Sequence, residues 1–141
     1  MILSKRLLNY KNVKHCFLGM ENEKSKGIYK SLNEVRDSTE TKIDVINKLN
    51  IACQKINSTD KNLVLLNQVH SNKFFFIGER KFKKKLVGDA LITNKKKIIL
   101  GILTADCAPV LIYDPKLEFI SAIHAGWRGA YKNIIKKVVT F

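Results

Sequence analysis

Short apolar runs, each bounded by glycine or polar residues, are the most regular feature of this chain. A continuous run of about four to eight Ile, Leu, Val or Phe residues between turn-forming residues is typical of a buried β-strand. We therefore expect strands at residues 63–66, 74–77, 87–93, 98–103 and 119–123. Alternating apolar positions at residues 13–18 predict one further strand.

Two other segments repeat apolar residues at helical spacing. Residues 39–57 place apolar side chains at three- and four-residue steps, with Cys53 on the apolar face, and predict an amphipathic helix. After residue 129 the pattern is again helical, with Ala130, Ile134, Ile135 and Val138 on one side and lysines on the other. Strands and helices in alternation predict a mixed α/β fold. With no internal repeat and no linker, we expect one domain spanning residues 1–141.

Three of the apolar runs lead into reactive side chains. His70 follows the first run, Cys107 follows the run at 98–103, and His124 follows the run at 119–123. Zinc binds Cys sulfur and His nitrogen, and a catalytic zinc site uses three protein ligands and leaves a fourth position open. These residues could form such a site. They have no local ligand spacing, however, and a His or Cys near a strand end is more often simply packed.

The chain is strongly basic, with a formal net charge of +14. Such a balance raises the question of a nucleic-acid or membrane partner. The basic residues are 22 Lys and only 4 Arg, and the runs at 81–85 and 95–97 lie at expected turns. This distribution favours a compositional bias over a selected binding surface, so we expect no specific nucleic-acid partner.

Cysteine usage and the hydrophobic profile bear on the compartment. Cys16, Cys53 and Cys107 are odd in number and lack a framework spacing, so disulfides are not expected. No secretory signal stands at residues 1–10, and no apolar run reaches the ~18 residues of a membrane span. We therefore expect a cytoplasmic protein without membrane contact.

Four motifs occur in a fixed order: NQVH at 67–70, GDALIT at 88–93, TADCAPVLIYD at 104–114 and HAGWRG at 124–129. With HCFLGMENEKSKGIYKSLN at 15–33, they resemble the bacterial laccase-domain family. This family is also called the polyphenol oxidase or peptidoglycan editing factor family and is mostly described as zinc-dependent purine nucleoside phosphorylase. The resemblance implies a layered sandwich of mixed β-sheets flanked by helices, a fold similar to that of cytotoxic necrotizing factor. Family members are longer, so we expect this chain to be incomplete at its C-terminus.

The resemblance also implies roles for individual residues. The metal ligands would be His70, Cys107 and His124, with zinc as the cofactor and copper as the alternative. The substrate-binding residues would be Asn33, Gln68, Trp127 and Arg128, and the catalytic residues Asp106 and Arg128.

Several of these roles have simpler alternatives. Arg128 lies in the first turn of an expected helix, where it could bind phosphate or pair with a carboxylate. Trp127 could stack on a purine or be a core or rim aromatic, and Asp106 could act as general acid or base or merely orient a ligand. His15 is a rival metal ligand, more simply interpreted as a packed or hydrogen-bonded residue.

The implied activity is phosphorolysis, in which phosphate cleaves adenosine, inosine or methylthioadenosine, together with adenosine deaminase activity at the same zinc site. One alternative is a copper-dependent polyphenol oxidase, for which three histidines are too few to hold a multicopper cluster. Another is a cysteine hydrolase that edits peptidoglycan precursors, with Cys107 as nucleophile. A non-enzymatic alternative is a zinc-stabilised basic RNA-binding module. Met20 stands where the family usually has Arg, and Ser71 replaces the Gly of QVHG, so the substrate preference is open.

Overall fold

The computed structural model describes residues 2–17, 50–51, 53–59, 62–78 and 86–141. The chain divides into two compact units, Met1–Lys61 and Asn62–Phe141, and each is described by itself. Residues 39–49 of the first predicted helix and the predicted substrate residue Asn33 lie outside the described residues. Within the described ranges, no helix has both the length and the apolar character needed to cross a membrane.

In the first unit, the described N-terminal residues form one helical turn and an isolated bridge. Helix α1 (Lys5–Leu8) begins after Ser4, whose hydroxyl accepts the amide hydrogen of Leu7. His15 Nε2 accepts the amide hydrogen of Ser4 at 2.8 Å, so this histidine has the hydrogen-bonded role that was the simpler alternative to a metal ligand.

The strand predicted at 13–18 is not present in the described residues. Residues 13–16 have no β-structure, and Phe17 forms only a single antiparallel bridge to Ile2. An alternating pattern supplies a two-sided segment, but a strand also needs a partner backbone along its length. The described end of the helix predicted at 39–57 is in part confirmed. Residues 53–55 are helical, and Cys53, predicted on the apolar face, is only 2% exposed.

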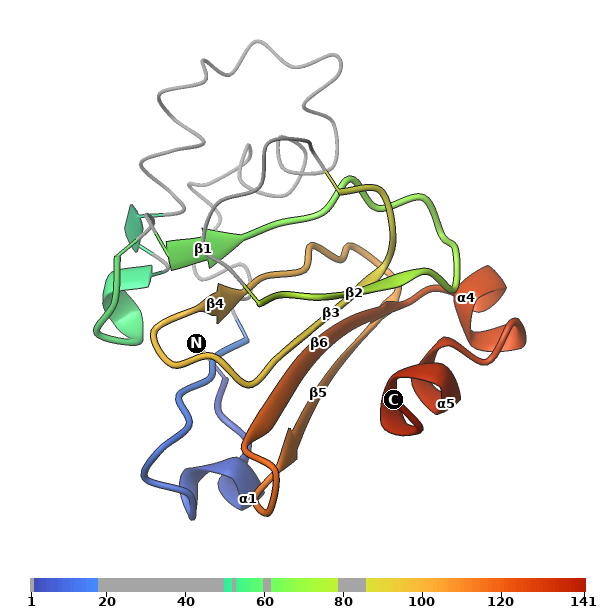
Figure 1. Ribbon diagram of the computed structural model, residues 1–141. Coiled ribbons are helices and arrows are strands. Elements are labelled where there is room, and N and C mark those ends of the chain that lie inside the picture. The colour runs from blue at the N-terminus through green and yellow to red at the C-terminus, as the bar shows by residue number, and fades with distance from the viewer. Residues whose placement is uncertain (1, 18–49, 52, 60–61, 79–85) are drawn as a thin grey trace, which may run out of the picture. The chain divides into compact units, whose positions relative to one another are not determined.

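The second unit is built on a four-stranded sheet of order β2-β3-β6-β5 (Figure 1). Its strands are β2 (Phe74–Phe76), β3 (Ala90–Thr93), β5 (Ala108–Asp114) and β6 (Phe119–Ala125). The β2–β3 pair is parallel, whereas β3–β6 and β5–β6 are antiparallel. Strands β1 (Leu63–Val64) and β4 (Ile99–Leu100) form a separate parallel pair.

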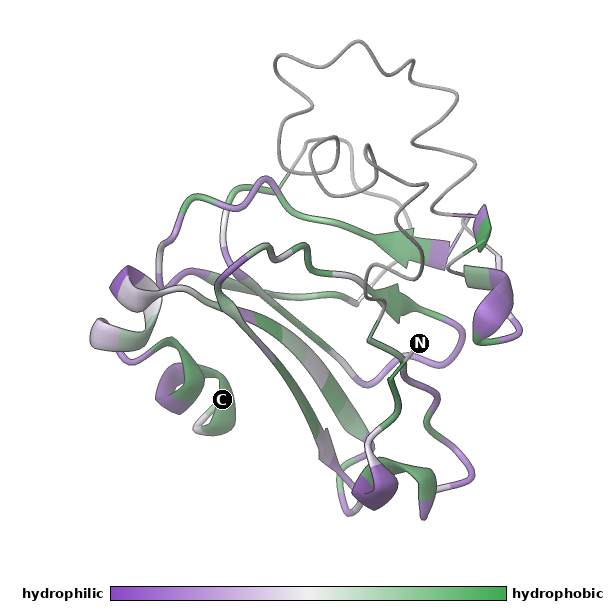
Figure 2. Ribbon diagram, turned by 180° about the vertical axis from the view of Figure 1, so that it is seen from behind, coloured by the Kyte–Doolittle hydropathy of each residue, from purple (hydrophilic) through white to green (hydrophobic). Residues whose placement is uncertain are grey.

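Both faces of β3 are covered, which explains why its residues 90–92 are all apolar. Ala90 and Ile92 pack on one side against Ile123 of β6 and Ile134 of helix α5 (Ile134–Val139). Leu91 packs on the other side, in a cluster with Val64, Leu66, Ile77 and Ile98. Figure 2 shows these strands as largely hydrophobic, while the last helix carries both hydrophobic and hydrophilic residues. The second unit is thus layered, with sheets and helices as the sequence predicts.

Strand β5 was not among the predicted strands. It lies at the edge of the sheet. Proline has no amide hydrogen to donate between strands, and an edge strand tolerates this because it has a neighbour on one side only. Its apolar core, residues 110–113, was a strand signal in the sequence. The Ala-Pro at the start of the strand is instead typical of a turn.

The C-terminal helix is also different from the prediction. It is broken into α4 (Trp127–Tyr131) and α5, because Asn133 adopts a left-handed conformation with φ of 59°. Asn tolerates this region better than most residues. Ile134 and Val138 are buried as predicted, but Ala130 and Ile135 are exposed, since the break changes the phase of the helical repeat.

Candidate metal centre

The β5–β6 hairpin brings Cys107 and His124 together at its open end. The antiparallel register pairs Ala108 with Ala125 and Pro109 with His124. Cys107 immediately precedes β5, and His124 is the sixth residue of β6. Cys107 follows the run at 98–103 as predicted and lies between β4 and β5, whereas His124, which was predicted to follow its strand, lies inside β6. They meet because β6 runs back antiparallel beside β5, an edge strand that the pattern did not predict.

His70 reaches the same place from the loop between β1 and β2. Asn67 forms a parallel bridge with Val87, and Phe74 pairs with Ala90. The path from 67 to 74 is longer than the path from 87 to 90, so residues 68–73 loop out beside the start of β3. His70 itself has a φ of 56°, a conformation that few non-glycine residues adopt.

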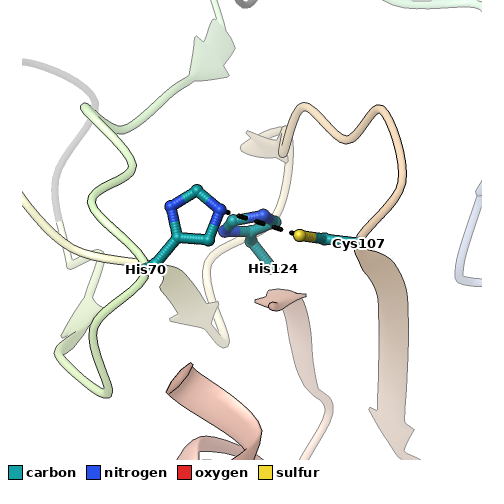
Figure 3. Close-up of side chains that lie close together, drawn as sticks. All are labelled: His70, Cys107 and His124. Carbon is teal, nitrogen blue, oxygen red and sulfur yellow. Dashed lines mark hydrogen bonds between the residues drawn. The ribbon is translucent and has the colours of Figure 1, made fainter. Parts of the chain in front are cut away.

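The three predicted ligands form one cluster (Figure 3). Their ligand atoms all lie within 4.8 Å of one another. Cys107 Sγ is 3.7 Å from His70 Nε2, and the two imidazole rings meet edge-on with centroids 4.8 Å apart. A tetrahedral zinc ion with bonds of about 2.0–2.3 Å separates its ligand atoms by roughly 3.3–3.6 Å. The donor types are ones that zinc accepts, and the three atoms would have to move closer together to bind one ion.

Gly126 provides the space beside these ligands. A Cβ atom built on it would lie 2.7 Å from His70 Cδ2, 3.1 Å from Cys107 Sγ and 3.6 Å from His124 Cε1. Its φ of −67° and ψ of 160° are open to any residue. The glycine is therefore required for room at the cluster and not for backbone freedom.

Asp89 lies behind the cluster and was not singled out from the sequence. It is fully buried, and its Oδ1 lies 2.9 Å from His124 Nδ1. The carboxylate also accepts hydrogen bonds from the amides of residues 69–71 and from the Ser71 hydroxyl. The available signal was an acidic residue directly before the fully apolar run 90–92, where a charge needs several donors.

Electrostatics differ between the two acidic neighbours. Burial by itself raises the pKa of Asp89, but hydrogen bonds from Ser71, His124 and His70 outweigh it and leave the pKa below its ordinary value. Asp106 is exposed, and its Oδ1 lies 3.6 Å from Cys107 Sγ. Burial, together with the charge and hydrogen bond of Asp106, raises the pKa of the Cys107 thiol in the metal-free chain.

The other predicted site residues have partners of their own. Gln68 Nε2 donates to the carbonyl of Leu103 at 2.6 Å, and its Oε1 accepts the Leu103 amide hydrogen at 2.8 Å. This pair of bonds ties the His70 loop to the segment that leads to Cys107. Trp127 is 73% exposed, and the guanidinium of Arg128 lies 5.2 Å from its ring centroid. Their roles toward a substrate remain predictions.

Comparison with solved structures supports this fold. Over 82% of the chain it is similar to a Neisseria meningitidis protein, with 27% identity, a TM-score of 0.66 and 46% of that chain covered. It is also similar to the Bacillus licheniformis hypothetical protein YfiH, with 24% identity and a TM-score of 0.66. That match covers 72% of this chain and 41% of YfiH. The mixed α/β fold predicted from the sequence is therefore confirmed.

Curated relatives carry functional names. A purine nucleoside phosphorylase of Bacteroides thetaiotaomicron is 33% identical over 92% of this chain and 51% of its own length. A purine nucleoside phosphorylase of Aquifex aeolicus is 36% identical over 75% of this chain and 49% of its own length. The chain thus spans about half the length of these relatives. The family profile described as multi-copper polyphenol oxidoreductase laccase matches residues 14–141, which include every residue of the cluster and Asp89, and the chain belongs to this family.

Proposed function

We propose that this chain binds one zinc ion through His70, Cys107 and His124 and contributes that site to purine nucleoside phosphorolysis. The observation that carries the proposal is the convergence of three metal-ligand atoms within 4.8 Å. Relatives that are 33% and 36% identical to the chain are named purine nucleoside phosphorylases. The substrates would be adenosine, inosine or methylthioadenosine, with phosphate as the second substrate.

The donor set favours zinc over copper. One thiolate sulfur and two imidazole nitrogens match the three protein ligands of a catalytic zinc site. A multicopper centre would need more histidines than the three in this chain, and His15 accepts a hydrogen bond from Ser4 in the other unit. Bound zinc would supply Lewis-acid stabilisation of developing negative charge. We expect a cytoplasmic enzyme, as the sequence predicts.

In phosphorolysis, a phosphate oxygen forms a bond to ribose C1′ while the bond from C1′ to the purine nitrogen breaks. The electron pair of the broken bond leaves with the base, which takes up a proton. Arg128 is the proposed phosphate ligand, since a guanidinium presents two parallel donors to phosphate oxygens. Trp127 offers an exposed ring next to it, suited to stacking on a purine.

Asp106 is the proposed proton donor or acceptor because it is exposed next to Cys107. It would protonate the departing base or, in adenosine deamination at the same site, move a proton between water and the leaving amine. Gln68 would act chiefly by holding the His70 loop to Leu103. Asn33 is proposed as a further substrate residue from the sequence resemblance alone.

A cysteine hydrolase is the second candidate, favoured by the 3.7 Å contact between Cys107 Sγ and His70 Nε2. A Cys–His–acid triad requires the acid to orient the histidine that activates the thiol. Here the acid Asp89 contacts His124, whereas the thiol contacts His70. This division suits two metal-ligating histidines better than it suits one catalytic base.

Metal analysis combined with an inosine-plus-phosphate assay tests the proposal. The unaltered chain should bind one equivalent of zinc and convert inosine to hypoxanthine only when phosphate is present. Cys107→Ala should lose both properties, while Cys53→Ala, a buried cysteine in the other unit, serves as the matched control for zinc. Full zinc binding by Cys107→Ala would refute the ligand assignment. Metal-free hydrolysis that depends on Cys107 would support the hydrolase, and copper-dependent phenol oxidation would support the oxidase.

A further inference from the structure

Asp89 accepts hydrogen bonds from two separate segments, the loop that carries His70 and the strand that carries His124. Five donors converge on its two oxygens: the amides of Val69, His70 and Ser71, the Ser71 hydroxyl and the Nδ1 side of His124. The amide of His124 also donates to the Asp89 carbonyl at 2.8 Å. The same acidic residue therefore contacts both histidines of the cluster: its carboxylate meets the ring of His124 and the backbone amide of His70.

The contact with His124 fixes which ring nitrogen carries the proton. An ionised carboxylate can only accept hydrogen bonds, so the 2.9 Å contact requires a hydrogen on His124 Nδ1. The neutral ring then has its lone pair on Nε2. Since His124 is 3% exposed and held in the β6 ladder, this lone pair has a fixed direction. A metal ligand needs such an oriented lone pair.

The contact with His70 stabilises an unfavourable backbone. His70 has a φ of 56°, which costs free energy for a residue with a side chain. Three consecutive amides, those of residues 69–71, point at the Asp89 carboxylate, an arrangement that binds an anion. Hydrogen bonds to the Asp89 carboxylate thus offset the strain in the His70 loop, and the same hydrogen bonds offset the cost of burying the negative charge.

We propose that Asp89 is the positioning residue of the metal centre: it orients His124 Nε2 toward Cys107 and holds the His70 loop so that both imidazoles face one point. This inference rests on the proposed metal site. It assigns Asp89 no contact with substrate or metal. Its action passes entirely through the two histidines, so its loss should weaken metal binding even when the chain remains folded.

The test compares metal binding by Asp89→Asn and Asp114→Asn. Asp114 accepts the amide hydrogens of Lys116 and Leu117 at the opposite end of the β5–β6 hairpin, which makes it a matched control for loss of a backbone-bonded carboxylate. Zinc affinity is measured by chelator competition, and Co²⁺ is used as a spectroscopic probe of ligand geometry. Circular dichroism and a thermal melt of each metal-free protein confirm that it is folded.

Asp89→Asn should bind zinc roughly 10–100-fold more weakly, the range typical of outer partners of metal-bound histidines. Its Co²⁺ complex should show altered ligand-field bands, while Asp114→Asn should match the unaltered protein in both measurements. A folded Asp89→Asn variant with unchanged zinc affinity and an unchanged Co²⁺ spectrum would overturn the proposal.

A second measurement needs no variant and no metal. Nitrogen chemical shifts of labelled histidine in the metal-free protein at pH 8 should place the proton of neutral His124 on Nδ1. The tautomer with a bare Nδ1 would overturn the proposal even if Asp89→Asn fails to fold. If the unaltered chain binds no zinc, the proposed function fails, whereas this spectrum still decides whether Asp89 orients His124.

Discussion

The two ends of strand β6 are stabilised in different ways. Near its C-terminal end, His124 is buried against the ionised Asp89, and the Cβ of a residue at 126 would meet all three predicted ligands. Near its N-terminal end, Phe119 meets Phe76 and Phe141 with ring centroids 6.1 and 6.4 Å apart. The Phe76 ring is 41% exposed and the Phe141 ring is 63% exposed.

The difference lies in how direction-dependent each set of contacts is. Hydrogen bonds to Asp89 have fixed donors and acceptors, and a buried polar group that loses its partner is costly. Aromatic contacts at the other end tolerate several ring orientations, and partial exposure limits what each ring contributes. We call the His124 end of β6 the metal end and the Phe119 end the aromatic end. We expect small changes at the metal end to alter zinc affinity strongly. Larger changes at the aromatic end should lower the unfolding free energy modestly and leave zinc affinity unchanged.

The largest effect is expected from His124→Ala. This change removes a buried side chain and one hydrogen bond to the Asp89 carboxylate, so we expect the metal-free protein to lose about 3 kcal/mol of unfolding free energy. His70→Ala removes an exposed candidate ligand and should cost less than about 1 kcal/mol of unfolding free energy. Both should abolish zinc binding. Urea unfolding measures the stabilities, and equal losses in the two variants would contradict the distinction between the histidines.

Gly126→Ala should separate metal binding from stability. The new methyl group would displace the exposed His70 ring, so zinc affinity should fall on the order of 100-fold, the size expected when ligand orientation is lost. Backbone angles at 126 accept alanine, so the unfolding free energy should change by about 1 kcal/mol or less. Gly78→Ala, whose Cβ would meet Phe76 at 3.4 Å among the described residues, is the matched control. Unchanged zinc affinity in Gly126→Ala would show that the ligands do not converge there.

Phe119→Ala tests the aromatic end. Loss of a half-buried ring should reduce the unfolding free energy by about 1–2 kcal/mol, and Phe119→Leu should cost roughly half as much. Zinc affinity should be unchanged in both, because the ring lies at the other end of β6 from His124. A parallel loss of zinc affinity in folded protein would mean that the two ends are coupled.

Arg128→Lys is expected to have the smallest effect. Lysine keeps the charge but loses the paired donors, so the KM for phosphate should rise a few-fold, about 1 kcal/mol or less. Zinc content should not change and the unfolding free energy should change little, since Arg128 and the Trp127 ring beside it are both exposed. Adenosine deamination needs no phosphate and is the internal control. If deamination falls in the same proportion, Arg128 does not act through phosphate.

Much of the fold could be predicted because its strands are short apolar runs. Strands β1, β2, β3, β4 and β6 each lie within or overlap a predicted run. Strand β5 was missed because its Pro109 is a turn signal, and only an edge position makes it compatible with a strand. The break at Asn133 was missed because the apolar spacing continues across it.

The types of the candidate ligands were evident from the sequence, because His and Cys next to apolar runs limit the chemistry to a few kinds of site. Their convergence depends on contacts between residues far apart in the chain. The β5–β6 register sets Cys107 beside His124, and the β3–β6 register sets Asp89 behind it. Residue types and local runs are properties of short segments, so the sequence by itself determined the mixed α/β class and the candidate ligands. Register and the partners of a buried charge are settled only when distant segments pack, so tertiary structure alone decided that Asp89 and Gly126 lie against the candidate ligands.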